Sequence, residues 1–417
     1  MEKITKNFSS MILQKTEGIE TGKAGLIWIY HSMKEFGLKK IIENKFRVKK
    51  SNNQISEYEK IMSVALMLIN GGNAIEDIEV LRADKGLIKG LGIKKIITGD
   101  TILNFFNIKK TGEKIKSINE ELAVKAMKKT KADNFIYDND ATYFNSKKKC
   151  ANYSYKKEKQ MSGLLGFLPK LGGICITADY RKGNISPSEG IIEQLKQAVK
   201  LARKAGKVIG IFRSDSAAHK YEIIKYCRDK AIKFYISIRK NKGIQEIIKS
   251  IAKKEWKTVK NQVGKEYVES IHVTNDITIR ILILRWRKTE TQLNLFEDNE
   301  YNYHVIGTND EEIEAKEWLE FHNGRMGSEN YNKELKNGLA IEYMPSHDFN
   351  KNKAYFMINI LAYNIIQIMK YFYLDNKENW NIKTLQNKFI NNCCKFIRHA
   401  RKVVCKIINV TDEATRK

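Results

Sequence analysis

The stretch KVIGIFRSDSAAH, residues 207–219, passes from an apolar run to a polar segment without an intervening loop. Residues 208–212 carry no charge, which is typical of a strand buried on both faces of a sheet. Asp215 follows three residues later, and the segment AAHKYEIIKYCRDKA after it has the apolar spacing of a helix. An aspartate at this junction either caps the helix or serves as a ligand at the end of the strand.

The segments on both sides predict a sheet with helices on its faces. NFIYDNDATYF (residues 134–144) alternates as a strand does, and LLGFLPKLGGICITADYRKGN (residues 164–184) is typical of a hairpin. A capped helix is predicted after Ser186 or Ser188, and IKFYISIRK (residues 232–240) predicts a further strand. This order favours a mixed sheet with both parallel and antiparallel pairs.

Patterns along the chain divide it into five regions. Residues 1–130 predict short helices joined by glycine turns, which suit a helix-turn-helix DNA-binding region or any other small helical bundle. An α/β core is predicted in two parts, residues 131–242 and 311–372, interrupted by a β-rich insertion at residues 243–310. The tail, residues 373–417, contains CCKFIRHARKVVCKI and is predicted to be a basic helical region.

The composition favours a polyanionic partner. Lys and Arg number 75 against 48 Asp and Glu, a formal net charge of +27, so nucleic acid is preferred over a merely solvated lysine surface. No apolar run approaches the roughly 18 residues of a membrane span, and no signal peptide is recognised, so a cytoplasmic protein is expected. The six cysteines form no CxxC pair, which argues for reduced thiols rather than a zinc site.

Carboxylates recur along the strands of the predicted sheet. Asp138 and Asp140 alternate onto one face of the first strand, and Asp215 follows a later strand. If these strands are neighbours, Asp140 and Asp215 converge, and converging carboxylates repel unless a cation lies between them. Oxygen ligands suit Mg²⁺ or Mn²⁺, and two such ions would suit phosphoryl transfer on a polyanion. Asp138 stays an alternative to Asp140, and Asp215 stays a candidate helix cap.

A further motif lies in HNGRMGSENYNKELK, residues 322–336, where the spaced polar residues are His322, Arg325, Glu329 and Lys336. Together with YDNDAT and FRSDSAAH, this spacing resembles the DDE transposases of bacterial insertion sequences. Within them it resembles the YREK-type subgroup, whose signature is Tyr, two residues, Arg, three residues, Glu, six residues, Lys. His322 stands where that signature has tyrosine.

Further segments resemble the insertion-sequence family thirteen-eighty, so the resemblance covers most of the chain: LINGG (68–72), EVLRAD (79–84), LLGF (164–167), RKGNISP (181–187) and LAYNI (361–365). The resemblance implies an RNase H-like core with helices on both faces of its sheet. It also implies cut-and-paste movement of an element at its terminal inverted repeats, through a DNA hairpin that the β insertion helps to hold. The implied partners are terminal-repeat and target double-stranded DNA, bound by a homodimer on paired ends and in contact with the bacterial nucleoid.

The resemblance implies a role for each matched residue. The catalytic residues, which would hold two Mg²⁺ or Mn²⁺ ions, are Asp140, Asp215 and Glu329. His322, Arg325 and Lys336 would contact DNA phosphates, although Arg325 and Glu329 could form an ordinary ion pair without function. Trp286 would stack on a flipped base, although a tryptophan in a strand is more often part of a core.

Two other functions are compatible with the same residues. One is a stand-alone RNase H-like nuclease that uses the same metals, against which the helical N-terminal region and the β insertion argue. The other is a catalytically inactive DNA-binding protein descended from a transposase. Such a descendant is expected to lack one of the acidic positions, and all three are present here.

Overall fold

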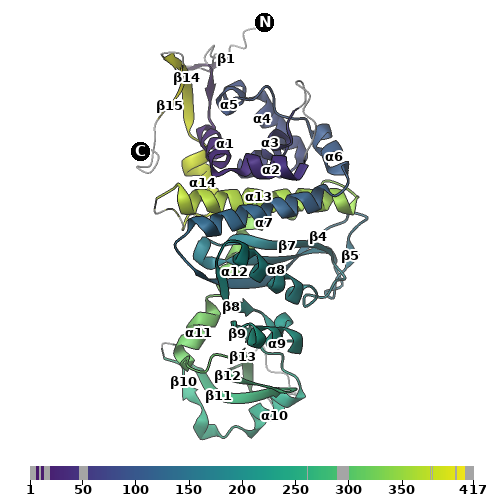
Figure 1. Ribbon diagram of the computed structural model, residues 1–417, viewed down its shortest axis with the longest axis vertical. Helices are drawn as coiled ribbons and strands as arrows, with labels where there is room; N and C mark the ends of the chain where they lie inside the picture. Colours follow the sequence, from purple (N-terminus) through teal and green to yellow (C-terminus); the bar gives the residue numbers. More distant parts are fainter. Residues whose placement is uncertain are drawn as a thin grey trace.

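The computed structural model describes residues 6–8, 11–13, 19–46, 55–260, 262–288, 300–375, 377, 379–399 and 402–408. At its centre is a mixed sheet (Figure 1), of which the core strands are β4 (Asn134–Asn145), β6 (Lys159–Leu168), β7 (Ile174–Lys182), β8 (Val208–Ser214) and β9 (Lys233–Ser237). Their order is β7, β6, β4, β8, β9, with β4, β8 and β9 parallel and β6 antiparallel to both of its neighbours. The predicted mixed α/β sheet is therefore confirmed.

The predicted hairpin joins β6 to β7. Pro169–Leu171 forms a 3₁₀ turn, and Gly172 and Gly173 both have positive φ values, 65° and 78°. Glycine adopts this conformation without steric cost. A Cβ atom on Gly173 would also lie 2.4 Å from the Tyr331 ring. The glycine pair therefore serves the turn and the close approach of the helix that carries Tyr331.

The β-rich insertion continues the core sheet rather than standing apart from it. Its strands are β10 (Lys257–Thr258), β11 (Lys265–Thr274), β12 (Ile277–Arg287) and β13 (Tyr301–Thr308). The last of them, β13, pairs antiparallel with β9, and β12, β11 and β10 follow in order. The insertion also begins with a helix, α10 (Lys242–Ser250), which the expected β-rich segment did not include.

Two long helices, α7 (Thr111–Lys129) and α13 (Phe349–Phe372), lie between the sheet and the N-terminal helices (Figure 1). The helices above them are α1 (Ala24–Phe36), α2 (Leu38–Phe46), α3 (Glu57–Ile69), α4 (Ile78–Ala83), α5 (Lys85–Leu91) and α6 (Gly99–Asn107). Asn364 on α13 accepts the N–H of Cys175 in β7 at 2.8 Å and donates to its carbonyl at 2.9 Å. Within the described residues, no helix is long and apolar enough to cross a membrane.

The remaining helices lie along the sheet and its extension: α8 (Ile191–Lys204), α9 (Tyr221–Asp229), α11 (Ala315–Asn323) and α12 (Met326–Leu339). Helix α8 packs against β7 and β8, whereas α12 lies over β4. Strand β4 therefore runs between α8 and α12. In β8, Ile209 and Phe212 are buried, whereas Val208 is exposed and Ile211 is only partly buried, so the apolar run at residues 208–212 is not buried along its whole length.

The two ends of the chain meet in a small sheet. Strand β3 (Glu20–Thr21) pairs with β14 (Cys393–His399), which forms a hairpin with β15 (Lys402–Ile408), and α14 (Ile382–Leu385) precedes them. Strands β1 (Lys6–Phe8) and β2 (Met11–Leu13) form a separate pair. A Cβ on Gly25 would lie 2.5 Å from the carbonyl oxygen of Phe389, so α1 packs directly on the backbone of the C-terminal region.

The prediction of a helical C-terminal tail is wrong at residues 393–399 and 402–408, which are strands. Cys394 is buried while Cys393 and Lys395 on either side of it are exposed, which is the period of a strand. The sequence fits both periods, because its apolar residues are frequent and many are β-branched. The edge of β3 supplies backbone partners that favour the strand. The N-terminal region, predicted to be helical, likewise contains the short strands β1, β2 and β3.

Candidate active site

The predicted carboxylates come from three neighbouring elements. Asp140 lies in β4 and Asp215 directly follows β8, the parallel neighbour of β4. Asn139 and Ser214 are partners in the register of these strands, so Asp140 and Asp215 are the next pair along. Glu329 lies in the first turn of α12. Asp215 and Glu329, which follow Asp140 by 75 and 189 positions in the sequence, are thus brought to the same end of the sheet.

The carboxylates affect one another electrostatically. The pKa of Asp140 is raised to about 6, chiefly by burial and then by the negative charge of Asp215, with a smaller contribution from Glu329. The cation of Arg325 and a hydrogen bond from Asn332 oppose this rise. Asp215 also caps a short 3₁₀ turn, because its Oδ1 accepts the N–H of Ala217 at 2.9 Å. The cap and a place near the other carboxylates are therefore compatible.

Arg325 lies between two of these acids. Its Nη2 is 3.3 Å from Oε1 of Glu329, and its Nη1 is 4.0 Å from Oδ1 of Asp140. The ion pair to Glu329 considered from the i, i+4 spacing is thus present. Arg325 also lies near a second carboxylate, that of Asp140 in the sheet. It therefore links α12 to β4, in addition to pairing with Glu329 one turn away.

Helix α12 is held on β4 by a regular set of contacts. Ser328 donates to Asp138 at 3.1 Å, Asn332 donates to Oδ2 of Asp140 at 2.7 Å, and the Nζ of Lys336 donates to the carbonyl of Tyr143 at 3.0 Å. Four helical residues rise about 6 Å and two strand residues about 6.7 Å, so Ser328 and Asn332, one turn apart, meet Asp138 and Asp140 on one face of the strand. This match fixes the position of Glu329 along β4.

Asp138 and Asp140 have different environments although they share a face. Asp138 is completely buried, and both of its oxygens accept from Arg213, each at 2.7 Å. Arg213 also donates to the carbonyl of Phe321 at 2.8 Å, at the end of α11. Asp138 is therefore committed to a structural ion pair, whereas Asp140 is only partly buried and faces the other two acids.

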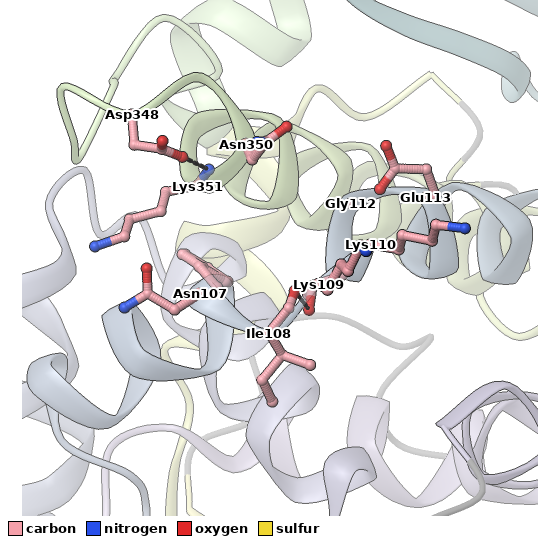
Figure 2. Close-up of a pocket in the computed structure, with 11 residues that line it drawn as sticks. Asn107, Ile108, Lys109, Lys110, Gly112, Glu113, Asp348, Asn350 and Lys351 are labelled. Atoms are coloured by element: carbon pink, nitrogen blue, oxygen red, sulfur yellow. Dashed lines mark hydrogen bonds between the residues drawn. The ribbon is translucent and has the colours of Figure 1, made fainter.

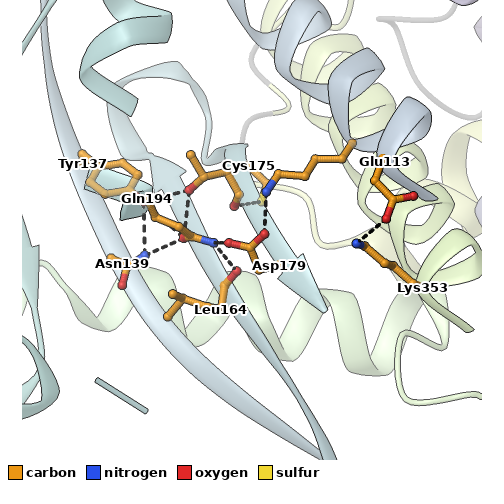
Figure 3. Close-up of polar contacts among 10 residues, drawn as sticks. Glu113, Tyr137, Asn139, Leu164, Cys175, Asp179, Gln194 and Lys353 are labelled. Carbon is orange, nitrogen blue, oxygen red and sulfur yellow. Dashed lines mark hydrogen bonds and ion pairs between the residues drawn. The ribbon is translucent and has the colours of Figure 1, made fainter. Parts of the chain in front are cut away.

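Behind β4, on the opposite face, lies a buried polar network (Figure 3). Oε1 of Gln194 accepts from Asn139 at 2.9 Å and from Thr177 at 3.0 Å, while its Nε2 donates to Asp179 at 2.6 Å. Asp179 is in turn paired with Lys116 of α7 at 2.5 Å. Asn139, which lies between Asp138 and Asp140 in β4, is thus held by a network that includes side chains of α8, β7 and α7. The alternation of β4 predicts that Asn139 lies on the face opposite the aspartates, but no sequence pattern identified the residues that contact it there.

The donor set suits a hard divalent cation. The three carboxylates supply only oxygen ligands, and the pKa of Asp140 is raised first by burial and then by the negative charges of Asp215 and Glu329. Among the described residues, however, no three His, Cys, Asp or Glu side chains stand close enough to hold one ion. Arg325 lies between Asp140 and Glu329, so its guanidinium occupies part of the space between these two acids.

Sequence comparison decides the family. The family described as Transposase DDE domain group 1 matches residues 6–415, nearly the whole chain. The chain belongs to the DDE transposase family. Members of this family carry out DNA transposition and recombination, with metal-dependent cleavage and transfer of DNA strands. No curated protein matches the sequence.

The transposase is also similar to a solved structure, the piggyBac transposase synaptic complex with hairpin DNA. The similarity has 10% sequence identity and a TM-score of 0.46, and it covers 87% of this chain and 78% of that one. A likeness at this level carries no functional argument. The family assignment therefore rests on the match over residues 6–415.

His322 of the transposase is buried between α11 and the sheet extension. It lies on α11 at 5% exposure, with its Nε2 3.3 Å from Oγ of Ser237 and its ring 5.5 Å from that of His304. Burial, with His304 and Arg325 nearby, lowers its pKa to about 3. A neutral, buried imidazole is a weak phosphate ligand, and the phosphate contact of His322 stays a prediction.

The buried His322 should make the transposase sensitive to mild acid. The unfolded chain takes up a proton near pH 6.5 and the folded chain only near pH 3, so protonation favours unfolding as the pH falls. Between pH 6.5 and about 5, this site alone is expected to reduce the free energy of unfolding by about 2 kcal/mol. Urea unfolding across this range measures it. The variant His322→Phe should reduce the slope, to which the lowered pKa values of His219 and His304 also contribute, and the exposed control His347→Gln should not. Equal slopes in all three proteins would contradict the assignment.

The other two expected DNA contacts, Lys336 and Trp286, are both partly buried. Lys336 is one-third exposed and lies 3.2 Å from Glu342, close to the carboxylates along α12. Trp286 is only half-buried in β12, with the Nζ of Lys265 5.8 Å from the centre of its ring. It packs against a small apolar cluster formed by the insertion together with β9 and α11. The core and stacking alternatives for Trp286 therefore both stay open.

A separate hollow of about 530 Å³ lies between α6 and the first turns of α7 and α13 (Figure 2). Its cationic lining residues are Lys109, Lys110 and Lys351. The two carboxylates in it have partners: Glu113 accepts from Lys353 at 2.9 Å, and Asp348 accepts the backbone N–H of Lys351 at 2.9 Å. None of the three candidate catalytic carboxylates lines this hollow, so it is distinct from their site.

Proposed function

We propose that this transposase cuts and rejoins DNA at the terminal inverted repeats of an insertion sequence, by a cut-and-paste route through a DNA hairpin. Asp140, Asp215 and Glu329 are the catalytic set. The observation that carries the proposal is that β4, the end of β8 and α12 bring these three acids together, where the pKa of Asp140 is raised by burial and then by the charges of Asp215 and Glu329. An arrangement that costs stability in this way is typical of functional sites.

The three acids fit Mg²⁺ or Mn²⁺, two ions in all. Such ions activate a water or hydroxyl nucleophile and stabilise the leaving oxygen of an in-line displacement. Asp140 is fixed by its strand and by Asn332, and Asp215 by its cap, so both present carboxylates without further ordering. Glu329 is half-exposed on its helix and is the acid most free to move.

Cations beside the acids would hold the substrate. Arg325 contacts both Asp140 and Glu329, and we propose that its guanidinium turns to a DNA phosphate when the acids bind metal. Lys336 lies two turns further along the same helix and would contact the next part of the backbone. These positions follow the YREK-type spacing, with the tyrosine position occupied by the buried His322.

The function is tested by cleavage of DNA that carries the sequences flanking the coding region. The purified transposase should cut this duplex at the repeat boundary with Mg²⁺ or Mn²⁺, should be inactive after chelation, and should regain activity when metal is restored. Hairpin ends would migrate as covalently joined strands on a denaturing gel. Specific binding without cleavage in any metal would favour the inactive descendant, and equal cleavage of unrelated duplexes would favour a stand-alone nuclease.

A further inference from the structure

The hollow between α6, α7 and α13 is lined by lysines that form no ion pair with any described residue. Lys109 and Lys110 lie in the turn from α6 to α7 and are exposed, whereas Lys351 lies in the first turn of α13 and is partly buried. The neighbouring Lys353, by contrast, is paired with a carboxylate. Three cations from two parts of the chain thus line one concave surface (Figure 2).

The two carboxylates in the hollow are already occupied. Glu113 accepts a hydrogen bond from Lys353 at 2.9 Å, so this pair is neutral as a unit. Asp348 accepts the backbone N–H of Lys351 at 2.9 Å and caps α13, so it is held by the helix rather than by a lysine ammonium group. The three lysines outnumber the one carboxylate that is left, and the hollow therefore attracts anions.

The walls of the hollow are held firmly by packing. A Cβ atom on Gly112 would lie 3.1 Å from Cγ of Lys353 and 3.3 Å from the backbone nitrogen of Ala354, so the first turn of α7 packs directly on α13. The hydroxyl of the buried Thr111 donates to the carbonyl of Ile108 at 2.8 Å and fixes the turn before α7. Because the backbone is ordered in this way, only the lysine side chains would lose conformational entropy on binding.

The positive charge continues beyond the hollow into the connection from β4 to β6, where residues 147–149 are three successive lysines. The N–H of Lys149 donates to Nδ1 of His347 at 3.2 Å, and Nδ2 of Asn352 donates to Sγ of Cys150 at 3.3 Å. His347 directly precedes the residue that caps α13, so this connection lies against the start of that helix. Together the two groups form one basic surface, made of Lys109, Lys110, Lys147, Lys148, Lys149 and Lys351.

We propose that this basic surface binds the phosphate backbone of the duplex away from the phosphate that is cut. This rests on the proposed function, because it takes terminal-repeat DNA as the substrate. A row of cations that extends past the hollow fits a polyanion, whose charges repeat along its length, rather than a single small anion. Lysine ammonium groups read no base sequence, so the contact positions the DNA and adds affinity without selecting the repeat.

The first test neutralises two lysines of the hollow and measures binding of terminal-repeat duplex by fluorescence anisotropy, without metal, over a range of salt concentrations. Loss of two phosphate contacts in Lys109→Gln with Lys351→Gln should reduce the slope of log affinity against log salt by about 1.8 and weaken binding by up to about 60-fold at 0.1 M salt. The matched control is Lys128→Gln with Lys131→Gln, which removes two exposed lysines at the other end of α7.

The second test uses the backbone of Lys110 to separate charge from folding. Its φ is 64°, a left-handed conformation that glycine adopts without steric cost. Lys110→Gly therefore removes a cation from the surface and relieves the backbone at the same position. The variant should unfold at no lower urea concentration than the wild type, yet bind the duplex about 8-fold more weakly at 0.1 M salt. Wild-type affinity in this variant would exclude Lys110 from the DNA contact.

The outcomes separate this proposal from the function on which it rests. Weaker binding by the lysine variants, with a wild-type cleavage rate once DNA is saturating, would support a contact that positions DNA away from the chemistry. Wild-type affinity and salt slope in the double variant, or an equal loss in the Lys128 and Lys131 control, would overturn the basic surface and leave cleavage intact. A wild-type protein that binds but never cleaves, with the lysine effects retained, would overturn the proposed function alone. A wild-type protein that binds no duplex would overturn both.

Discussion

Replacing Asp215 by asparagine or Glu329 by glutamine is expected to reduce the rate of metal-dependent DNA cleavage by about 10³-fold, because each removes a charged ligand worth several kcal/mol at the transition state. The substitutions keep the size of the side chain. Asparagine can still cap the 3₁₀ turn through its carbonyl oxygen, so the fold around residue 215 is retained. Single-turnover cleavage of end-labelled terminal-repeat duplex in Mg²⁺ measures the effect.

Two further readouts make this result specific. The exposed carboxylates Glu222 of α9 and Glu320 of α11 serve as matched controls, and Glu222→Gln and Glu320→Gln should cleave at the wild-type rate. DNA affinity without metal should be unchanged or higher in the Asp215 and Glu329 variants, since a negative charge near the phosphates has been removed. Cleavage by either variant within a few-fold of wild type would exclude that residue from the metal site.

Replacing Arg213 by methionine is expected to lower the free energy of unfolding by about 3–5 kcal/mol, the usual cost of leaving one member of a buried ion pair alone. Asp138 would lose two hydrogen bonds of 2.7 Å each in a fully buried position. The carbonyl of Phe321 would lose its partner too, which loosens the link from β8 to α11. Chemical unfolding followed by circular dichroism measures the change.

The companion variant distinguishes the ion pair from simple packing. Replacing both partners, Asp138→Leu with Arg213→Met, should recover much of the lost stability, because no charge then remains buried. Lys207→Met, which removes an ion pair to the exposed Asp133, should cost no more than about 1 kcal/mol. A loss below about 1 kcal/mol in Arg213→Met would show that the pair is not critical to the fold.

Much of the core could be predicted because its signals are local. The alternation of residues 134–144, the apolar run at 208–212 and the paired glycines at 172–173 each report on the backbone of a single element. The pairing of β9 with β13 is different, because it joins strands that are far apart in the sequence. It depends on which edge strand of the core sheet is available for a new partner. The C-terminal hairpin was missed for a related reason. Its residues fit two periods, and the deciding partner, β3, lies at the other end of the chain.

The candidate site shows the same limit at the level of side chains. Alternation placed Asp138 and Asp140 on one face, but only the approach of Arg213 from β8 shows which of them is occupied by an ion pair. The motif spacing selected Glu329 and Arg325, whereas Ser328 and Asn332 were overlooked, although they hold the helix on the strand. His322 was given a DNA contact because its position matches a motif, and motif spacing contains no information about burial.

The meeting of β3 with β14, and of Gly25 with the backbone of Phe389, has a consequence for synthesis on the ribosome. At roughly 5–20 residues per second, the first helices emerge about half a minute before the segment that completes their packing. Until then their apolar faces, and the unpaired edge of β3, lack their final cover. A prematurely terminated product that stops before residue 349 would also lack α13, the helix between the two layers. Such fragments would be expected to aggregate or be degraded, which would limit the amount of incomplete transposase that could compete for DNA ends.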